Sequence, residues 1–349
     1  MTALGAVCLD RSYASCPGCE QGSFPADRLL GLSGWLTRRA LEMAVRSGIH
    51  EPFRKAESLL RELAGWSVDA STLRRRCHEQ AEAAAEGRPT RAALPQAFAA
   101  AAGDCELHID AGKVFGTDKK WHDIKLAVLL KRERGDPSDS ATFSQRDVPT
   151  PSVRSVVAAV ETRQEFGIRV EAEVERLEMP LSKGLNVLGD GAEWIWDIAS
   201  DHFHGAACVL DFWHAAKHLA AAGRCGLGET QAMRAWLEEA KTALAADGYA
   251  GACQMLAKAV GADGVMGPEV VSELNYFAGQ QERLGYAVRL RRGQAIGSGA
   301  VEGAIKQLVN LRIKRTAARW TVAGVGPFVE LLAMADTPEW REHWNALAS

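Results

Sequence analysis

The sequence predicts an α/β protein whose strands and helices alternate through the middle of a 349-residue chain. Three observations predict this class. Short runs of strand-forming residues recur between residues 104 and 211, two of these runs end in an aspartate, and helical periodicity fills most of the remaining chain. The length is sufficient for two or three domains with hydrophobic cores.

Composition excludes several classes of protein. Hydrophobic residues make up 47% and charged residues 24%, which is ordinary for a globular chain. The net charge of −3 means that any nucleic-acid binding depends on local basic patches. No apolar run approaches the ~20 residues of a membrane span, and the first residues do not resemble a signal peptide. The eight scattered cysteines predict a reducing cytoplasm rather than a disulfide framework.

Residues 26–86 have helical periodicity, and their second half has the outline of a helix-turn-helix. One helix is predicted from about residue 53, to be stopped by Gly65, and Ser67 or Asp69 can cap the next. Arg74, Arg75 and Arg76 lie near the start of that second helix. We expect a DNA-binding helix-turn-helix here, although a plain helical hairpin with a solvated basic face has the same pattern.

The next segments alternate between the two kinds of structure. Residues 87–103 are expected to form a linker, and residues 105–115 and 121–133 a β-hairpin. A loop is expected over 132–152, a helix from Val153 to about Arg176, a strand over 184–190, a helix from Ala192, and a strand over 206–211. Residues 226–292 are expected to be helical throughout, and two further helices are predicted near 299–314 and 323–335.

Asp110 and Asp190 each end a predicted strand. Reactive residues in open α/β sheets lie at strand ends, so the two carboxylates are expected side by side if their strands are neighbours. Two close carboxylates repel each other unless a divalent cation neutralises them, and Mg²⁺ prefers such oxygen ligands.

A third acid, Glu302, lies in the first turn of a basic helix. It is followed by Lys306, Arg312, Lys314, Arg315 and Arg319, which could follow a row of phosphates. The alternative is that Glu302 and Lys306 form an ordinary ion pair on a solvated helix face.

Together these blocks resemble bacterial insertion-sequence transposases of the DDE class, in the Kra-like group related to Mutator-type transposases. The residues that carry the resemblance are HIDAGKV (Asp110), LGDGAEWIWD (Asp190), LDFWHAAKHL (Asp211 and His214) and IGSGAVEGAIKQLVNLRIKRTAARW (Glu302). It extends from about Ser12 to the C-terminus.

The resemblance implies an RNase-H-like catalytic core formed by residues 104–225 and 293–349, with residues 226–292 as a helical insertion. Asp110, Asp190 and Glu302 would be the catalytic residues and bind two Mg²⁺ ions, or Mn²⁺, for phosphodiester cleavage and strand transfer. Asp211 and His214 would support the site, unless Asp211 merely caps its helix and His214 is a core histidine. Trp194, Trp196 and Trp213 are candidates for stacking on a flipped base, with core packing as the alternative.

The implied partner is double-stranded DNA, namely the terminal inverted repeats and the target. Arg74, Arg75, Arg76, Lys306, Arg312, Lys314, Arg315 and Arg319 are the expected DNA contacts. We further expect a homo-oligomer on DNA, no membrane association, and a cytoplasmic, nucleoid-associated bacterial protein.

The N-terminus departs from the family, which usually has a further Cys-x-x-Cys pair. Residues 1–25 are therefore expected to be the remnant of a zinc ribbon in a truncated chain. Cys16 and Cys19 are two ligands of the four that a closed zinc site needs, so zinc binding there is a doubtful hypothesis.

Two alternatives follow from these features. The chain can be a catalytically inactive, DNA-binding remnant that acts at transposon ends. It can also be another carboxylate enzyme, such as a glycoside hydrolase with two acids, but that reading leaves the basic stretch after Glu302 and the helix-turn-helix outline unexplained.

Overall fold

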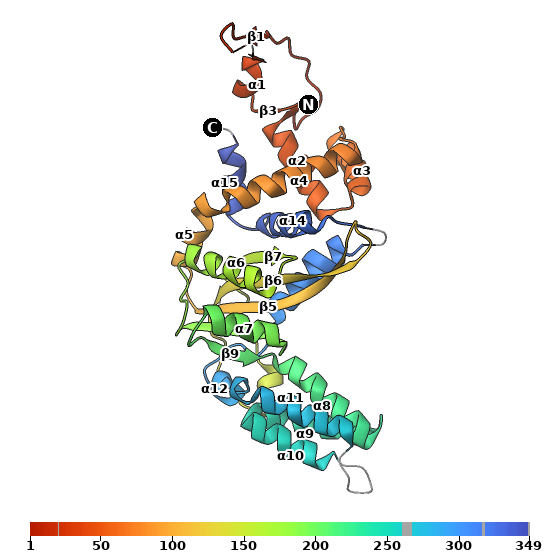
Figure 1. The fold of residues 1–349 in the computed structure, drawn as a ribbon, viewed down its shortest axis with the longest axis vertical. Coiled ribbons are helices and arrows are strands. Elements are labelled where there is room, and N and C mark those ends of the chain that lie inside the picture. Colours follow the sequence, from red (N-terminus) through yellow and green to blue (C-terminus); the bar gives the residue numbers. More distant parts are fainter. Residues whose placement is uncertain (20, 260–266, 316–317, 348–349) are drawn as a thin grey trace.

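The computed structural model describes residues 1–19, 21–259, 267–315 and 318–347, and a mixed five-stranded sheet lies at its centre (Figure 1). The strands are β5 (Asp104–Phe115), β6 (Trp121–Arg132), β7 (Val153–Ala159), β8 (Leu185–Gly189) and β9 (Ala207–Leu210). Their order is β7-β6-β5-β8-β9. β6 is antiparallel to both β5 and β7, whereas β8 pairs parallel to β5 and β9 parallel to β8. The predicted α/β class and hairpin are confirmed.

The N-terminal part precedes the sheet and lies at one end of the molecule (Figure 1). Its elements are β1 (Ala14–Ser15), β2 (Gly22–Ser23), α1 (Pro25–Leu29), β3 (Leu32–Ser33), β4 (Leu36–Thr37), α2 (Arg38–His50), α3 (Phe53–Ala64) and α4 (Ala70–Gly87). Gly65 ends α3 with a left-handed φ of 73°, a conformation that glycine adopts without strain. Asp69 caps α4 by accepting a hydrogen bond from the backbone N–H of Thr72. The predicted helix–turn–helix boundaries are therefore confirmed.

Two hydrophobic cores cover the two faces of the sheet. Alternate residues of one strand face opposite sides, so Val157 and Ala159 of β7 join one core while Val156 and Ala158 join the other. The first core contains α6 (Arg163–Arg176) and α7 (Glu193–His202). The second contains α2, α3, α4, α14 (Val322–Met334) and α15 (Glu339–Ala346). The helix-turn-helix region thus shares a core with the sheet.

A block of helices follows β9 and extends from the sheet away from α2–α4 (Figure 1). It consists of α8 (Phe212–Leu227), α9 (Gln231–Asp247), α10 (Tyr249–Lys258), α11 (Pro268–Gly279), a 3-10 turn η3 (Gln281–Arg283) and α12 (Tyr286–Arg291). Residues 260–266 of the predicted insertion lie outside the described residues. The chain then returns to the sheet through α13 (Gly299–Ala304), which continues as a π-helix, η4 (Ile305–Ile313). None of the described helices is long and apolar enough to cross a membrane.

Two predictions about local structure are wrong. Residues 153–159 form strand β7 instead of the start of a helix, because their β-branched side chains pack in both cores while the backbone pairs with β6. The helix begins only at Arg163, where Thr162 and Glu165 form a capping box. The expected linker over 87–103 contains the 3-10 turn η1 (Arg88–Thr90) and α5 (Ala93–Ala100), whose Leu94 and Phe98 are buried. The second 3-10 turn, η2 (Phe143–Gln145), lies in the predicted loop.

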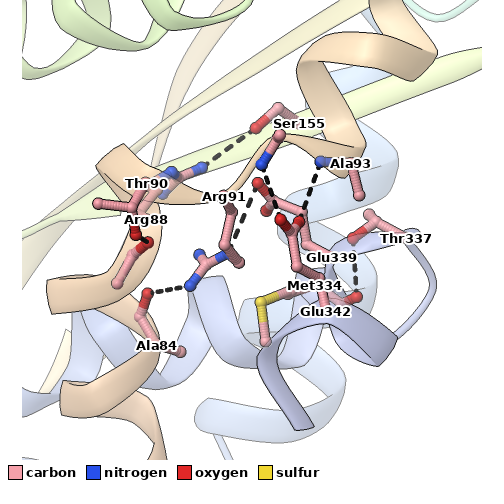
Figure 2. A network of polar contacts seen from close by, with 12 residues as sticks. Ala84, Arg88, Thr90, Arg91, Ala93, Ser155, Met334, Thr337, Glu339 and Glu342 are labelled. Carbon is pink, nitrogen blue, oxygen red and sulfur yellow. Dashed lines mark hydrogen bonds and ion pairs between the residues drawn. The ribbon is translucent and has the colours of Figure 1, made fainter. Parts of the chain in front are cut away.

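A buried polar network joins the end of α4 to the sheet and to the C-terminal helices (Figure 2). Arg88 donates to the Ser155 hydroxyl and forms ion pairs with Glu173 at 3.1 Å and Glu330 at 2.7 Å. Arg91 donates to the carbonyl of Ala84 and lies 3.6 Å from a carboxylate oxygen of Glu339. The orientation of α4 on the sheet is therefore fixed by charges as well as by apolar packing.

Candidate active site and nucleic-acid interface

Three aspartates lie at the same level of three neighbouring parallel strands. Asp190 and Asp211 directly follow β8 and β9, whereas Asp110 lies within β5, which continues to Phe115 because it stays paired with β6. The prediction that a strand ends at Asp110 is therefore wrong. Ile109 of β5 pairs with Gly189 of β8, and Gly189 pairs with Leu210 of β9. The next residues, Asp110, Asp190 and Asp211, are therefore neighbours across the sheet, about 5 Å apart along the backbone from one strand to the next. The expectation that the first two strands are neighbours is confirmed.

Asp110 and Asp190 keep their carboxylates available. Each accepts a hydrogen bond from a nearby backbone N–H, Asp110 from Ala111 at 2.6 Å and Asp190 from Ala192 at 3.0 Å. Neither forms an ion pair with a lysine or arginine of the described chain. Burial, together with the charges of Asp190 and Glu302, raises the pKa of Asp110 to about 6, against the lowering effect of the Ala111 hydrogen bond. The site thus has an excess of negative charge that a cation would relieve.

Asp211 has a different role from its two neighbours. It is buried, and one carboxylate oxygen caps α8 by accepting from the N–H of His214 at 2.6 Å. Its other oxygen accepts from the N–H and, at 3.0 Å, the hydroxyl of Ser298, and the Phe212 N–H donates to the carbonyl of Ile296. Asp211 therefore caps its helix, as one sequence alternative held. It also anchors the Ile296–Ser298 loop, which precedes Glu302.

Glu302 lies on α13, with its side chain exposed, and its charge reaches Asp110. Val309 and Ile305 of the continuing π-helix pack over Gly112 of β5, where a β-carbon would lie 3.2 Å from Val309. The small residue thus lets the helix that carries Glu302 approach the strand that carries Asp110. Within the described residues, no three acidic, histidine or cysteine side chains are grouped closely enough to hold a metal ion.

The helical block supports the aspartates from the other side. The ring of His214 lies 5.1 Å from that of His218, which stacks on Tyr276 of α11 at 3.7 Å. The Tyr276 hydroxyl donates to the carbonyl of Asp190 at 3.4 Å. Burial lowers the pKa of His214, against the opposing charge of Asp190. Sequence reasoning missed Tyr276, because nothing in the periodic helical stretch distinguishes it from a core residue.

A scan against models of known protein families found no match for this chain, and a search of curated proteins found none either. The residues and their geometry therefore carry the functional argument.

Two sets of basic residues, about 240 positions apart in the sequence, line one groove. Arg74 and Arg75 of α4 face Arg315 and Arg319, which follow η4, across a cavity of about 880 Å³. Phe53, His78 and Trp320 line the same cavity. The groove combines cations with aromatic rings, which suits a nucleic-acid backbone.

The other predicted DNA contacts are placed differently. Arg312 is buried, and its guanidinium donates to the carbonyls of Ile49 at 2.7 Å and Gly48 at 2.8 Å in the last turn of α2. Arg312 thus lines the same groove, but its guanidinium is held by these carbonyls and is largely shielded from the solvent, although the helical spacing placed it on the basic stripe. Arg76 donates to Ser33 and pairs with Glu79. Lys306 is exposed on η4, and Lys314 lies over the ring of Trp121.

Cys16 and Cys19 are exposed and unbridged in the turn between β1 and β2. Hydrogen bonds from the backbone of Gly18 and Cys19, and from the Cys19 thiol, lower the pKa of Cys16. Among the residues described, no further histidine, cysteine or acid completes a metal-binding group with them.

Proposed function

We propose that this chain is a DNA transposase with an RNase-H-like catalytic core, which cleaves and joins phosphodiester bonds at transposon ends. The observation that carries the proposal is the position of Asp110 and Asp190 directly after the paired Ile109 and Gly189 of two neighbouring parallel strands, with the charge of Glu302 acting on Asp110. The sheet, with three antiparallel strands and two further parallel ones, agrees with such a core.

The donor chemistry of these residues suits Mg²⁺ or Mn²⁺. Within the described residues, no lysine or arginine forms an ion pair with the carboxylates of Asp110 and Asp190, so their oxygens can bind a cation. The raised pKa of Asp110 reflects its burial and the nearby acids. With Glu302, they are the residues that would hold the ions. When bound, two such ions stabilise the attacking and the leaving oxygen of a phosphodiester displacement.

The remaining residues of the chain bind and position the DNA. The groove between α4 and the segment after η4 provides Arg74, Arg75, Arg315 and Arg319 for the phosphates of a duplex. Asp211 fixes the loop before α13, and Tyr276 buttresses the backbone at Asp190. A homo-oligomer on DNA, with a nucleoid-associated location, remains part of this proposal.

The test is Mg²⁺-dependent nicking of a supercoiled plasmid that carries the DNA flanking this gene. We expect nicking by the wild type and by Asp247→Asn, which changes an exposed aspartate at the end of α9. We expect none from Asp190→Asn, whose amide cannot replace the metal-binding charge. Nicking by Asp190→Asn at the wild-type rate would refute the proposed site.

A gel-shift assay with the same flanking DNA distinguishes a transposase from the alternative, a catalytically inactive DNA-binding protein. If the wild type binds the DNA but does not nick it under any of the metal conditions, the chain is a non-catalytic DNA-binding protein at transposon ends.

A further inference from the structure

A second, smaller pocket borders the loop that Asp211 holds through Ser298. Its volume is about 250 Å³, and it is lined by Arg132, Phe143, Arg146, Trp213 and residues 295–297 and 299–300, among others. Ser298 of this loop is held by Asp211, while its neighbours Gly297 and Gly299 line the pocket. A group bound there would lie one loop away from the aspartates.

Trp213 forms one wall of the pocket, and the protein covers only about half of its surface. Its side chain is 48% exposed, whereas Phe143 behind it, at a ring separation of 6.2 Å, is buried. Gly297 lies against the indole, where a β-carbon would come within 3.3 Å of Trp213 Cδ1 and 3.1 Å of an Asp211 oxygen. The glycine thus keeps the loop close to Trp213. By contrast, Trp196 is buried and Trp194 packs beside Phe166.

Two guanidinium groups provide positive charge beside this ring. Arg132 lies 3.3 Å from a carboxylate oxygen of Glu106, but that carboxylate is shared with His108 at 2.8 Å. Arg146 donates to the carbonyl of Gln294 and has no carboxylate partner within the described part of the chain. Burial lowers the pKa of Arg146, and the charge of Arg132 lowers it further. The positive charges of Arg132 and Arg146 are therefore only partly balanced by carboxylates of the described residues.

We propose that this pocket binds one unpaired nucleotide of a DNA strand, with its base on Trp213 and its phosphate beside Arg132 and Arg146. The proposal rests on the proposed DNA function. The volume is below the ~300–1,000 Å³ of pockets for drug-sized ligands, so it suits one nucleotide and is too small for a duplex. An aromatic face accepts any base by stacking, and a guanidinium suits a phosphate.

The experiment compares two fluorescein-labelled duplexes by anisotropy in EDTA, so that no cleavage takes place. One duplex carries a single unpaired thymidine, and the other has an abasic residue at the same position. We expect the wild type to bind the thymidine duplex more tightly, by roughly five- to 150-fold if stacking has its usual strength. Trp213→Ala abolishes this preference, and Trp213→Phe keeps part of it.

Trp35→Ala is the matched control, because Trp35 is 46% exposed in the N-terminal region, far from the pocket in the sequence. It should retain the full preference. Arg146→Ala should weaken the binding of both duplexes equally, because the phosphate is common to them, whereas Arg234→Ala, at an exposed position on α9, should weaken neither.

Three results would overturn the pocket proposal: no preference in the wild type, a preference that survives in Trp213→Ala, or an equal loss in Trp35→Ala. Duplex binding without any base preference overturns this inference alone. A wild type that binds neither duplex overturns the proposed DNA function as well.

Discussion

Replacement of Arg88 by methionine should destabilise the protein strongly, because it removes a buried cation from between two acids. The Arg88 side chain is 17% exposed, and those of Glu173 and Glu330 are 4% and 12% exposed. Methionine fills much of the same space without the charge, so the acids remain buried with one positive charge fewer. Removal of one partner of a buried ion pair costs about 3–5 kcal/mol.

This free energy translates into a measurable shift of the melting temperature. The unfolding entropy is about 2.1 cal/mol/K per residue, which amounts to roughly 0.7 kcal/mol/K for 349 residues that unfold as one unit. Arg88→Met should therefore lower the melting temperature by about 4–7 °C. Thermal unfolding followed by circular dichroism measures the shift directly.

A surface ion pair is the matched control for this change. Arg75 pairs with Glu79 at 2.9 Å on the same helix, but their side chains are 56% and 40% exposed. Arg75→Met should cost less than about 1 kcal/mol, because water screens the exposed pair. The double variant Arg88→Met/Glu330→Leu should be less destabilised than Arg88→Met, because Glu173 keeps its ion pair with Arg176 at 2.8 Å and the second change removes Glu330, the acid that loses its partner. Equal shifts for Arg88→Met and Arg75→Met would refute the reasoning.

Three further outcomes are expected. Asp211→Ala should slow plasmid nicking more than Ser298→Ala, because it removes the cap of α8 as well as the contacts to Ser298. Gel shifts should show unchanged DNA affinity, and a loss of affinity would contradict this role. Arg312→Met should lower the urea midpoint and change the slope of log affinity against log salt less than Arg315→Ala does, which should reduce that slope by about 0.9. The reverse pattern would contradict the burial of Arg312. Burial lowers the pKa of His343 from 6.5 to about 4. As the pH falls from 6.5 towards 4, this histidine is therefore protonated in the unfolded chain but not in the folded one, and the free energy of unfolding decreases. The free energy of unfolding of the wild type should therefore decrease between pH 6.5 and pH 5, and His343→Gln should make this decrease smaller by up to about 2 kcal/mol. Urea unfolding at the two pH values measures the decrease. The same decrease in both proteins would exclude His343 as its source.

Features that depend on a few consecutive residues could be predicted from the sequence. Gly65 ends α3 and Asp69 caps α4, because a left-handed φ and a side-chain acceptor act within one helical turn. The position of Asp190 at a strand end follows in the same way from a short apolar run that stops at an acid, whereas the strand that contains Asp110 continues to Phe115.

The burial of a charge could not be predicted in this way. Arg312 has the helical spacing of the basic residues around it, and only the carbonyls of Gly48 and Ile49, more than 260 positions away, distinguish it. Residues 153–159 likewise look helical in isolation, and pairing with β6 makes them a strand.

The sequence by itself determined the end of α3, the cap of α4, the hairpin of β5 and β6 and the identity of the acids. The tertiary structure decided that Asp211 holds Ser298, that Tyr276 supports Asp190, and that the residues around Trp213 form a pocket. The physical reason is distance along the chain: caps and periodicity are local interactions, whereas burial and hydrogen bonds between remote segments exist only once the chain has folded.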